Sequence, residues 1–180
     1  MIRSLAVICI FTILHSVSAE NCQNSFIRDE KNLRKMYILL RKKSRECTFS
    51  TLDYVRFGGR AILSGYSKEA YWAASRALKN SKENTIHYLN ANLLKATALN
   101  DMRRNEEAIE ILRPIALNSS KQSSIYQKIY LELIRAYYLK NDQKIDDNVL
   151  FLFAKFNNKF PKSRYSPLLS AWIKDAKTMF

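Results

Sequence analysis

The sequence is poor in the residues that interrupt helices, with three glycines and three prolines among 180 residues. Folds made of many short strands need frequent tight turns, and Gly and Pro are leading turn residues. Leu, Lys, Ala, Ile and Asn are abundant instead. No segment alternates apolar and polar residues for long enough to make a convincing strand. The composition therefore predicts an all-α protein.

Groups that carry out catalysis are also scarce. The chain has two histidines, and only His87 lies beyond the N-terminal apolar stretch, so the rest of the chain cannot build a two-histidine zinc site. Glu106 and Glu107 are adjacent and point to different sides of a helix, unlike a converging acid and base. Gly58 and Gly59 lack the lysine and spacing of a phosphate-binding loop. We expect no enzyme activity, no metal site and no cofactor.

Residues 1–19 have the pattern of a signal peptide. Arg3 is followed by an apolar run from Leu5 to Leu14, and Val17-Ser18-Ala19 is a small-residue cleavage site. A membrane-spanning helix needs about 20 apolar residues, and this run ends sooner. No second long apolar segment follows, so we expect an exported chain with no transmembrane segment after cleavage. A lipoprotein signal places a cysteine directly at the cleavage point. Cys22 instead lies three residues beyond Ala19, which does not favour a lipid anchor.

Two cysteines remain if Cys9 is removed with the signal peptide. In an exported protein the pair Cys22 and Cys47 is a candidate disulfide. A helix over residues 29–44 would separate its ends by about 24 Å, so this bond requires the segment before the helix to run back nearly extended. Free thiols and an intermolecular bond are the alternatives.

Positive charge dominates the chain. The formal net charge is +14, and much of it lies between Arg28 and Arg45. The predicted basic face consists of Lys31, Arg34, Lys35, Arg41 and Lys42. Such a face is either a solvated surface that aids solubility or a docking surface for an anionic partner. Export argues against nucleic acid and leaves acidic proteins, lipid head groups and cell-wall polymers.

Apolar residues recur at helical spacing along the rest of the chain. This spacing predicts helices over residues 26–40, 52–63, 68–78, 85–99, 106–117, 125–140, 149–159 and 167–179. We divide the chain into a signal peptide (1–19), a basic N-terminal helix (20–50), a region of helix pairs (51–160) and a C-terminal capping helix (161–180).

Equivalent residues in the helix pairs recur every 38 positions. Gly58 matches Ala96 and then Ile134, and Ala70 matches Ala108. These small residues at this spacing resemble the tetratricopeptide repeat (TPR) family. The resemblance implies a TPR-like solenoid of about three helical hairpins with an extra helix at each end. Asp146 stands where a third alanine should be, which predicts a shifted second helix in that unit.

The segment Phe156 to Tyr165 is similar to the repeats of bacterial envelope proteins such as the outer-membrane assembly lipoprotein of the BamD type. Both close one helix with an aromatic residue, a proline and a serine before the next helix opens. This chain lacks that group's lipidation cysteine at the cleavage site. The resemblance implies a location in the periplasm of a Gram-negative bacterium.

The resemblance also implies a concave groove, lined by the first helix of each pair. The residues it assigns to partner binding are Asn90, Leu93, Thr97, Asn100, Lys128, Leu131, Arg135 and Tyr138. Arg and Tyr often dominate the binding energy of interfaces. Alternatively, Leu131 and Tyr138 pack against the last helix. The expected function is a periplasmic scaffold that binds a peptide or helix of a partner protein in envelope assembly or secretion. A cationic module for anionic lipid or cell-wall polymer is the alternative.

Overall fold

The computed structural model describes residues 30–118 and 123–178, with side chains described as far as residue 174. These residues form helices and no strand, which confirms the all-α prediction. The helices are α2 (Leu33–Lys43), α3 (Thr51–Leu63), α4 (Ser67–Lys79), α5 (Ile86–Asp101), α6 (Asn105–Asn118), α7 (Ser124–Lys140), α8 (Asp147–Lys159) and α9 (Ser166–Thr178).

The first described helix begins later than the apolar pattern predicts. Asn32 caps α2, and its side chain accepts a hydrogen bond of 3.0 Å from the backbone N–H of Lys35. Lys31 therefore precedes the helix rather than lying on it. Cys47, in the turn after α2, is disulfide-bonded. Its expected partner Cys22 lies outside the described residues, as does the signal-peptide segment.

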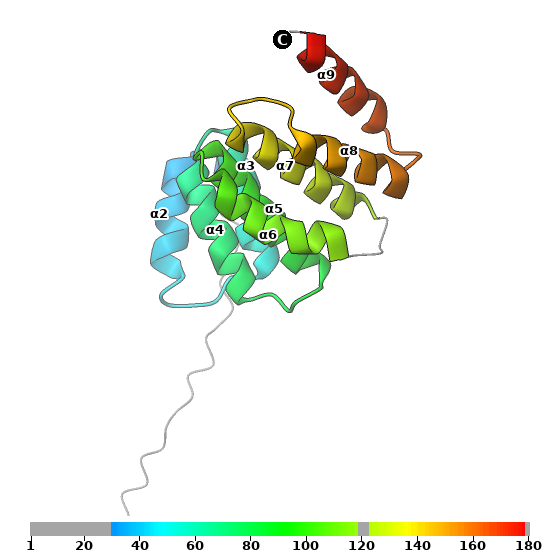
Figure 1. Ribbon diagram of the computed structural model, residues 1–180. Helices are drawn as coiled ribbons and strands as arrows, with labels where there is room; N and C mark the ends of the chain where they lie inside the picture. The colour runs from blue at the N-terminus through cyan, green and yellow to red at the C-terminus, as the bar shows by residue number, and fades with distance from the viewer. Residues whose placement is uncertain (1–29, 119–122, 179–180) are drawn as a thin grey trace, which may run out of the picture.

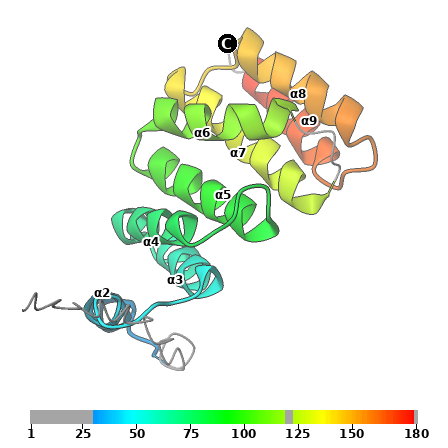
Figure 2. The same ribbon diagram turned by 90° about the horizontal axis from the view of Figure 1, so that it is seen from below.

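The helices pack in chain order. Each helix from α3 to α8 packs on the next, and α3 also packs on α5 and α5 on α7. Figure 2 shows the helices following one another across the molecule, from α2 at one end to α8 and α9 at the other. Each later pair of helices therefore adds to the end of the array, as successive hairpins do.

Two helix-ending turns repeat where the sequence repeats. Gly65, after α3, has a φ of 79°, and Arg103, after α5, has a φ of 59°. The following N–H groups, of Tyr66 and Arg104, each donate a 2.8 Å hydrogen bond to the carbonyl of the residue five positions earlier. This left-handed ending closes a helix and reverses the chain. The 38-residue period therefore appears in the backbone as well as in the sequence.

Small residues line the contacts between the first helices. Ala70, Ala73, Ala74 and Ala77 of α4 are completely buried, as is Ala108 at the equivalent position of α6. These alanines therefore lie where α4 and α6 pack against their neighbouring helices.

Helix α5 separates two hydrophobic cores. Ala91, Leu94 and Ala98 belong to the core that contains α2, α3 and α4. Leu89, Ala96 and Leu99 belong to the core that contains α6, α7 and α8. A helix buried on two sides in this way joins the halves of the array.

The third helix pair departs from the period, as Asp146 predicts. Helices α4 and α6 begin 38 residues apart, but α8 begins 42 residues after α6. Asp146 caps α8 by accepting a 2.9 Å hydrogen bond from the N–H of Val149. Helix α9 follows α8 and is the last described helix (Figure 1). Its Trp172 packs edge-on against Tyr138 of α7, with ring centroids 4.8 Å apart.

We predict opposite effects from substituting the two neighbouring glycines of α3. A Cβ on Gly58 would overlap Leu94 of α5 and lie 3.4 Å from the Cβ of Ala73, whereas a Cβ on Gly59 meets nothing within 4 Å. Gly58→Leu should lower the free energy of unfolding by about 1–3 kcal/mol through overpacking. Gly59→Ala should raise it by about 0.5–1 kcal/mol through helix propensity. Urea unfolding followed by circular dichroism measures both, and equal effects would contradict the close approach of α3 and α5.

A second prediction concerns pH and the cap of α8. Burial raises the pKa of Asp146, but hydrogen bonds from Asn148 and the N–H of Val149 outweigh it and hold the pKa below its ordinary value. A carboxylate with a lowered pKa stabilises the fold above its unfolded pKa and loses this effect as pH falls through the folded pKa. Asp146→Ala should therefore cost about 1 kcal/mol at pH 7, and this cost should shrink as the pH falls below the unfolded pKa and through the lower pKa of the folded chain.

The matched control is Asp146→Asn, because an amide oxygen caps a helix without titrating. Thermal unfolding at neutral and acidic pH compares the stability of the unchanged chain, Asp146→Ala and Asp146→Asn. A cost of Asp146→Ala that is the same at both values would show that the carboxylate does not act as the cap.

Candidate functional site

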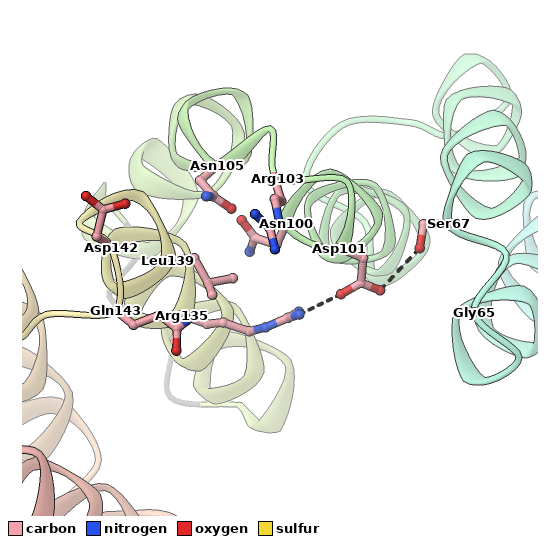
Figure 3. A pocket seen from close by; sticks show the side chains of 10 residues that line it. All are labelled: Gly65, Ser67, Asn100, Asp101, Arg103, Asn105, Arg135, Leu139, Asp142 and Gln143. Carbon is pink, nitrogen blue, oxygen red and sulfur yellow. Dashed lines mark hydrogen bonds and ion pairs between the residues drawn. The ribbon is translucent and has the colours of Figure 1, made fainter.

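A polar cleft of about 710 Å³ lies at one edge of the helix array. It is bounded by the ends of α5 and α7, the starts of α4 and α6, and the turns between them (Figure 3). The lining residues are Gly65, Ser67, Asn100, Asp101, Arg103, Asn105, Arg135, Leu139, Asp142 and Gln143. The cleft thus draws on three successive helix pairs, and the left-handed turn residues Gly65 and Arg103 both form part of its wall.

An ion-pair network crosses this cleft. Arg135 of α7 donates to Asp101 of α5 at 2.5 Å and to Glu132 of its own helix at 2.9 Å. Asp101 in turn accepts a 3.5 Å hydrogen bond from the hydroxyl of Ser67 at the start of α4. Figure 3 shows the guanidinium of Arg135 reaching across to Asp101, with Ser67 beyond it. The network therefore joins α4, α5 and α7 with one cation between two carboxylates.

The environment keeps Arg135 charged. Burial alone lowers the pKa of Arg135, but the hydrogen bond to Asp101 and the charges of Glu132 and Asp101 outweigh it and raise the pKa. The guanidinium is held in one orientation by two carboxylates from different helices. Arg135 is thus engaged within the protein, although 41% of its side chain stays exposed to solvent.

Asn100 lies at the buried side of the cleft. It is 2% exposed, and its amide nitrogen donates to the Glu132 carboxylate at 2.7 Å. This bond fixes the amide orientation, because a carboxylate accepts hydrogen bonds only. The Oδ1 atom of Asn100 and that of Asn105 are buried and have no hydrogen-bond partner. Two residues that line the cleft therefore each have a buried carbonyl oxygen without a donor inside the protein.

The structure brings only two of the predicted groove residues, Asn100 and Arg135, into one site, where both contact Glu132. Tyr138 packs against Trp172 of the last helix, as the alternative interpretation holds for this residue. Leu131 packs against the second core instead. Leu93 also packs against this core. Thr97 donates its hydroxyl hydrogen to the carbonyl of Leu93 at 3.0 Å. Asn90 is half-buried and Lys128 is exposed, and neither lines the cleft.

Sequence reasoning missed four participants: Ser67, Asp101, Asn105 and Glu132. Glu132 had a usable signal, because it is the one acidic residue of α7 and lies three positions before Arg135, where an ion pair forms on a helix. Asp101 and Asn105 lie in or beside a segment that reads as an ordinary polar turn. Their meeting with α7 depends on how neighbouring hairpins stack, which local sequence does not encode.

Four of the five residues assigned to the basic face, Arg34, Lys35, Arg41 and Lys42, lie on α2 and are exposed. Lys35 forms a 3.2 Å ion pair with Glu30. This face and the polar cleft are separate surfaces, since no residue of α2 lines the cleft.

Within the described residues, no three His, Cys, Asp or Glu side chains come together in a way that could hold a metal ion. None of the described helices combines the length and the apolar character needed to cross a membrane. Comparison with models of known protein families, with curated proteins and with solved structures finds no match to this chain.

We predict that the ion-pair network contributes to stability. Arg135→Ala leaves the carboxylate of Glu132, whose side chain is 14% exposed, and that of Asp101 without their cation. The free energy of unfolding should fall by about 1–3 kcal/mol, because half-buried carboxylates lose charge-assisted hydrogen bonds. Lys140→Ala is the control, since its ion pair with Glu106 is largely exposed and should contribute less than about 1 kcal/mol. Chemical unfolding measures both variants, and similar losses would contradict a special role for the network.

Proposed function

We propose that this chain is an exported, non-catalytic helical-repeat scaffold that binds a segment of a partner protein in the polar cleft. The observation that carries the proposal is the pair of buried, unpartnered amide oxygens of Asn100 and Asn105 in a cleft that spans three helix pairs. A buried acceptor without a donor costs about 1–3 kcal/mol. A ligand that supplies two donors to these oxygens recovers this free energy.

A peptide segment fits this chemistry well. Each residue other than proline carries a backbone N–H group, so an extended segment presents donors at regular intervals. Arg135 is already paired with both Asp101 and Glu132. These three side chains form part of the cleft without requiring a charged ligand. The left-handed turns that hold Gly65 and Arg103 bring main chain to the rim, where it can contact a peptide directly.

A TPR-like solenoid is the arrangement we propose for the helices. It is supported by packing in chain order, by the contacts of α3 with α5 and α5 with α7, and by the repeated turns 38 residues apart. Burial of the alanines of α4 and of Ala108 also agrees with the small-residue positions of that family. Proteins built in this way commonly present extended surfaces for binding other proteins.

The proposed setting is the periplasm. It rests on the signal-peptide pattern of residues 1–19 and on the resemblance of Phe156 to Tyr165 to bacterial envelope repeats. The disulfide of Cys47 agrees with an oxidising compartment, because disulfides are rare in the cytosol. The partner is therefore sought among proteins of the cell envelope.

Cross-linking from the cleft tests the proposal in intact cells. A photoreactive amino acid at exposed Gln143, on the rim, should give a discrete adduct with one envelope protein, identified by mass spectrometry. The same group at exposed Lys155 of α8, which does not line the cleft, is the positional control. Equal labelling of the same protein from both positions would contradict a site in the cleft.

The acceptor itself is tested with matched asparagine variants. Asn105→Ala removes one of the unpartnered oxygens and should reduce the adduct from position 143 about fivefold or more, as the loss of roughly 1 kcal/mol implies. Asn90→Ala changes an asparagine of α5 that does not line the cleft and should leave the adduct unchanged. The reverse result would place binding on the predicted groove instead.

A further inference from the structure

Helix α2 carries a strong local excess of positive charge. Five of its eleven residues are Arg or Lys, and none is acidic. Arg34, Arg41 and Lys42 are exposed and form no ion pair with the described carboxylates. Exposed Lys35 pairs with Glu30. Arg41 also donates a 3.3 Å hydrogen bond to the hydroxyl of Tyr37 and lies over the rings of Tyr37 and Trp72. The helix therefore presents Arg34 and Lys42 as exposed cations without an ion pair to a described carboxylate.

An exposed isoleucine lies in the middle of these cations. Ile38 is 58% exposed, although isoleucine is among the residues most often buried. On a helix, residues three and four positions apart are surface neighbours. The four such neighbours of Ile38 are Arg34, Lys35, Arg41 and Lys42. The guanidinium of Arg41 leans over the rings of Tyr37 and Trp72, so the outer face of α2 is formed by Ile38 with Arg34, Lys35 and Lys42.

This face is held outward by the packing of the opposite side. Met36 and Leu40 are completely buried in the first core. Tyr37 stacks on Phe57 of α3 at 6.0 Å between ring centroids and meets Trp72 of α4 edge-on at 5.4 Å. Because these contacts fix the rotation of the helix, Ile38 and its basic neighbours cannot turn inward without losing them.

A second exposed apolar side chain stands beside this face. Tyr66, in the α3–α4 turn, is 46% exposed and lines a cleft of about 440 Å³ with Ile38. Leu33, Arg34, Tyr37 and Glu69 complete the lining. Tyrosine suits a boundary between water and an apolar phase, because its ring is apolar and its hydroxyl is polar.

We propose that the outer face of α2, with Tyr66, docks on an anionic lipid surface. The cations supply attraction to negatively charged head groups, and Ile38 and Tyr66 gain by entering the boundary between head groups and acyl chains. An acidic polymer would use the charges but would give the exposed isoleucine no apolar environment. This surface is separate from the polar cleft. The inference therefore goes beyond partner binding, because it adds binding of the scaffold to a membrane surface.

Sedimentation with vesicles tests the inference. The expressed chain is mixed with vesicles of neutral phosphatidylcholine alone or with 30% anionic phosphatidylglycerol (about one lipid in three), at low and high salt. Every variant shares the same N-terminal segment, so any contribution of that segment is common to all. Binding should be stronger to the anionic vesicles and should weaken as salt rises. The double variant Arg34→Gln/Lys42→Gln should bind about 25-fold more weakly, at roughly fivefold per charge.

Matched variants separate the apolar contribution from general effects. Ile38→Ser should weaken binding to anionic vesicles several-fold, because its apolar contact is lost. Leu168→Ser replaces an apolar residue of α9 that is 68% exposed and should leave binding unchanged. Any of three results would overturn the inference. The two serine variants could lose binding equally, the double variant could bind as well as the unchanged chain, or the protein could show no preference for anionic vesicles. Retention on polyglutamate without vesicle binding would overturn it in favour of an acidic protein partner.

Discussion

The arrangement depends on the burial of α5 from two sides. Its Ala91, Leu94 and Ala98 complete one core, while Leu89, Ala96 and Leu99 complete another. Each neighbouring hairpin covers only one side of this helix, so neither half of the array can bury its apolar surface without the other. The close approach that this requires is made possible by Gly58, where any side chain would meet Leu94.

The polar cleft is a consequence of the same stacking. Because α5 and α7 pack side by side, Asn100 and Asp101 at the end of one helix meet Glu132 and Arg135 of the other. A carboxylate between an arginine and an amide fixes the amide orientation, which leaves the carbonyl of Asn100 without a donor. The ion pairs and the unpartnered oxygen of Asn100 therefore have one cause, the meeting of α5 with α7.

Charge is distributed unevenly over the array. Helix α2 carries five basic residues and no acidic one, and among its exposed cations Lys35 pairs with Glu30, whereas the cleft contains a cation held between two carboxylates. The α3–α4 turn lies between the two surfaces, since Gly65 and Ser67 line the cleft and Tyr66 lines the α2 side. A lipid surface at α2 and a peptide in the cleft would thus occupy separate surfaces that meet at the α3–α4 turn.

The helical class, most helix boundaries, the small-residue positions of the repeat and the displacement of α8 at Asp146 could be predicted from the sequence, because they follow from local propensity, capping and periodic burial. The predicted start of the first helix was wrong, because α2 begins only after its cap Asn32 although apolar residues recur at helical spacing before it. The contact of Arg135 with Asp101, the packing of Tyr138 on Trp172 and the outward position of Ile38 became clear only in the folded chain. These features depend on the rotation and spacing of stacked helices, which are set by packing between residues distant in the chain.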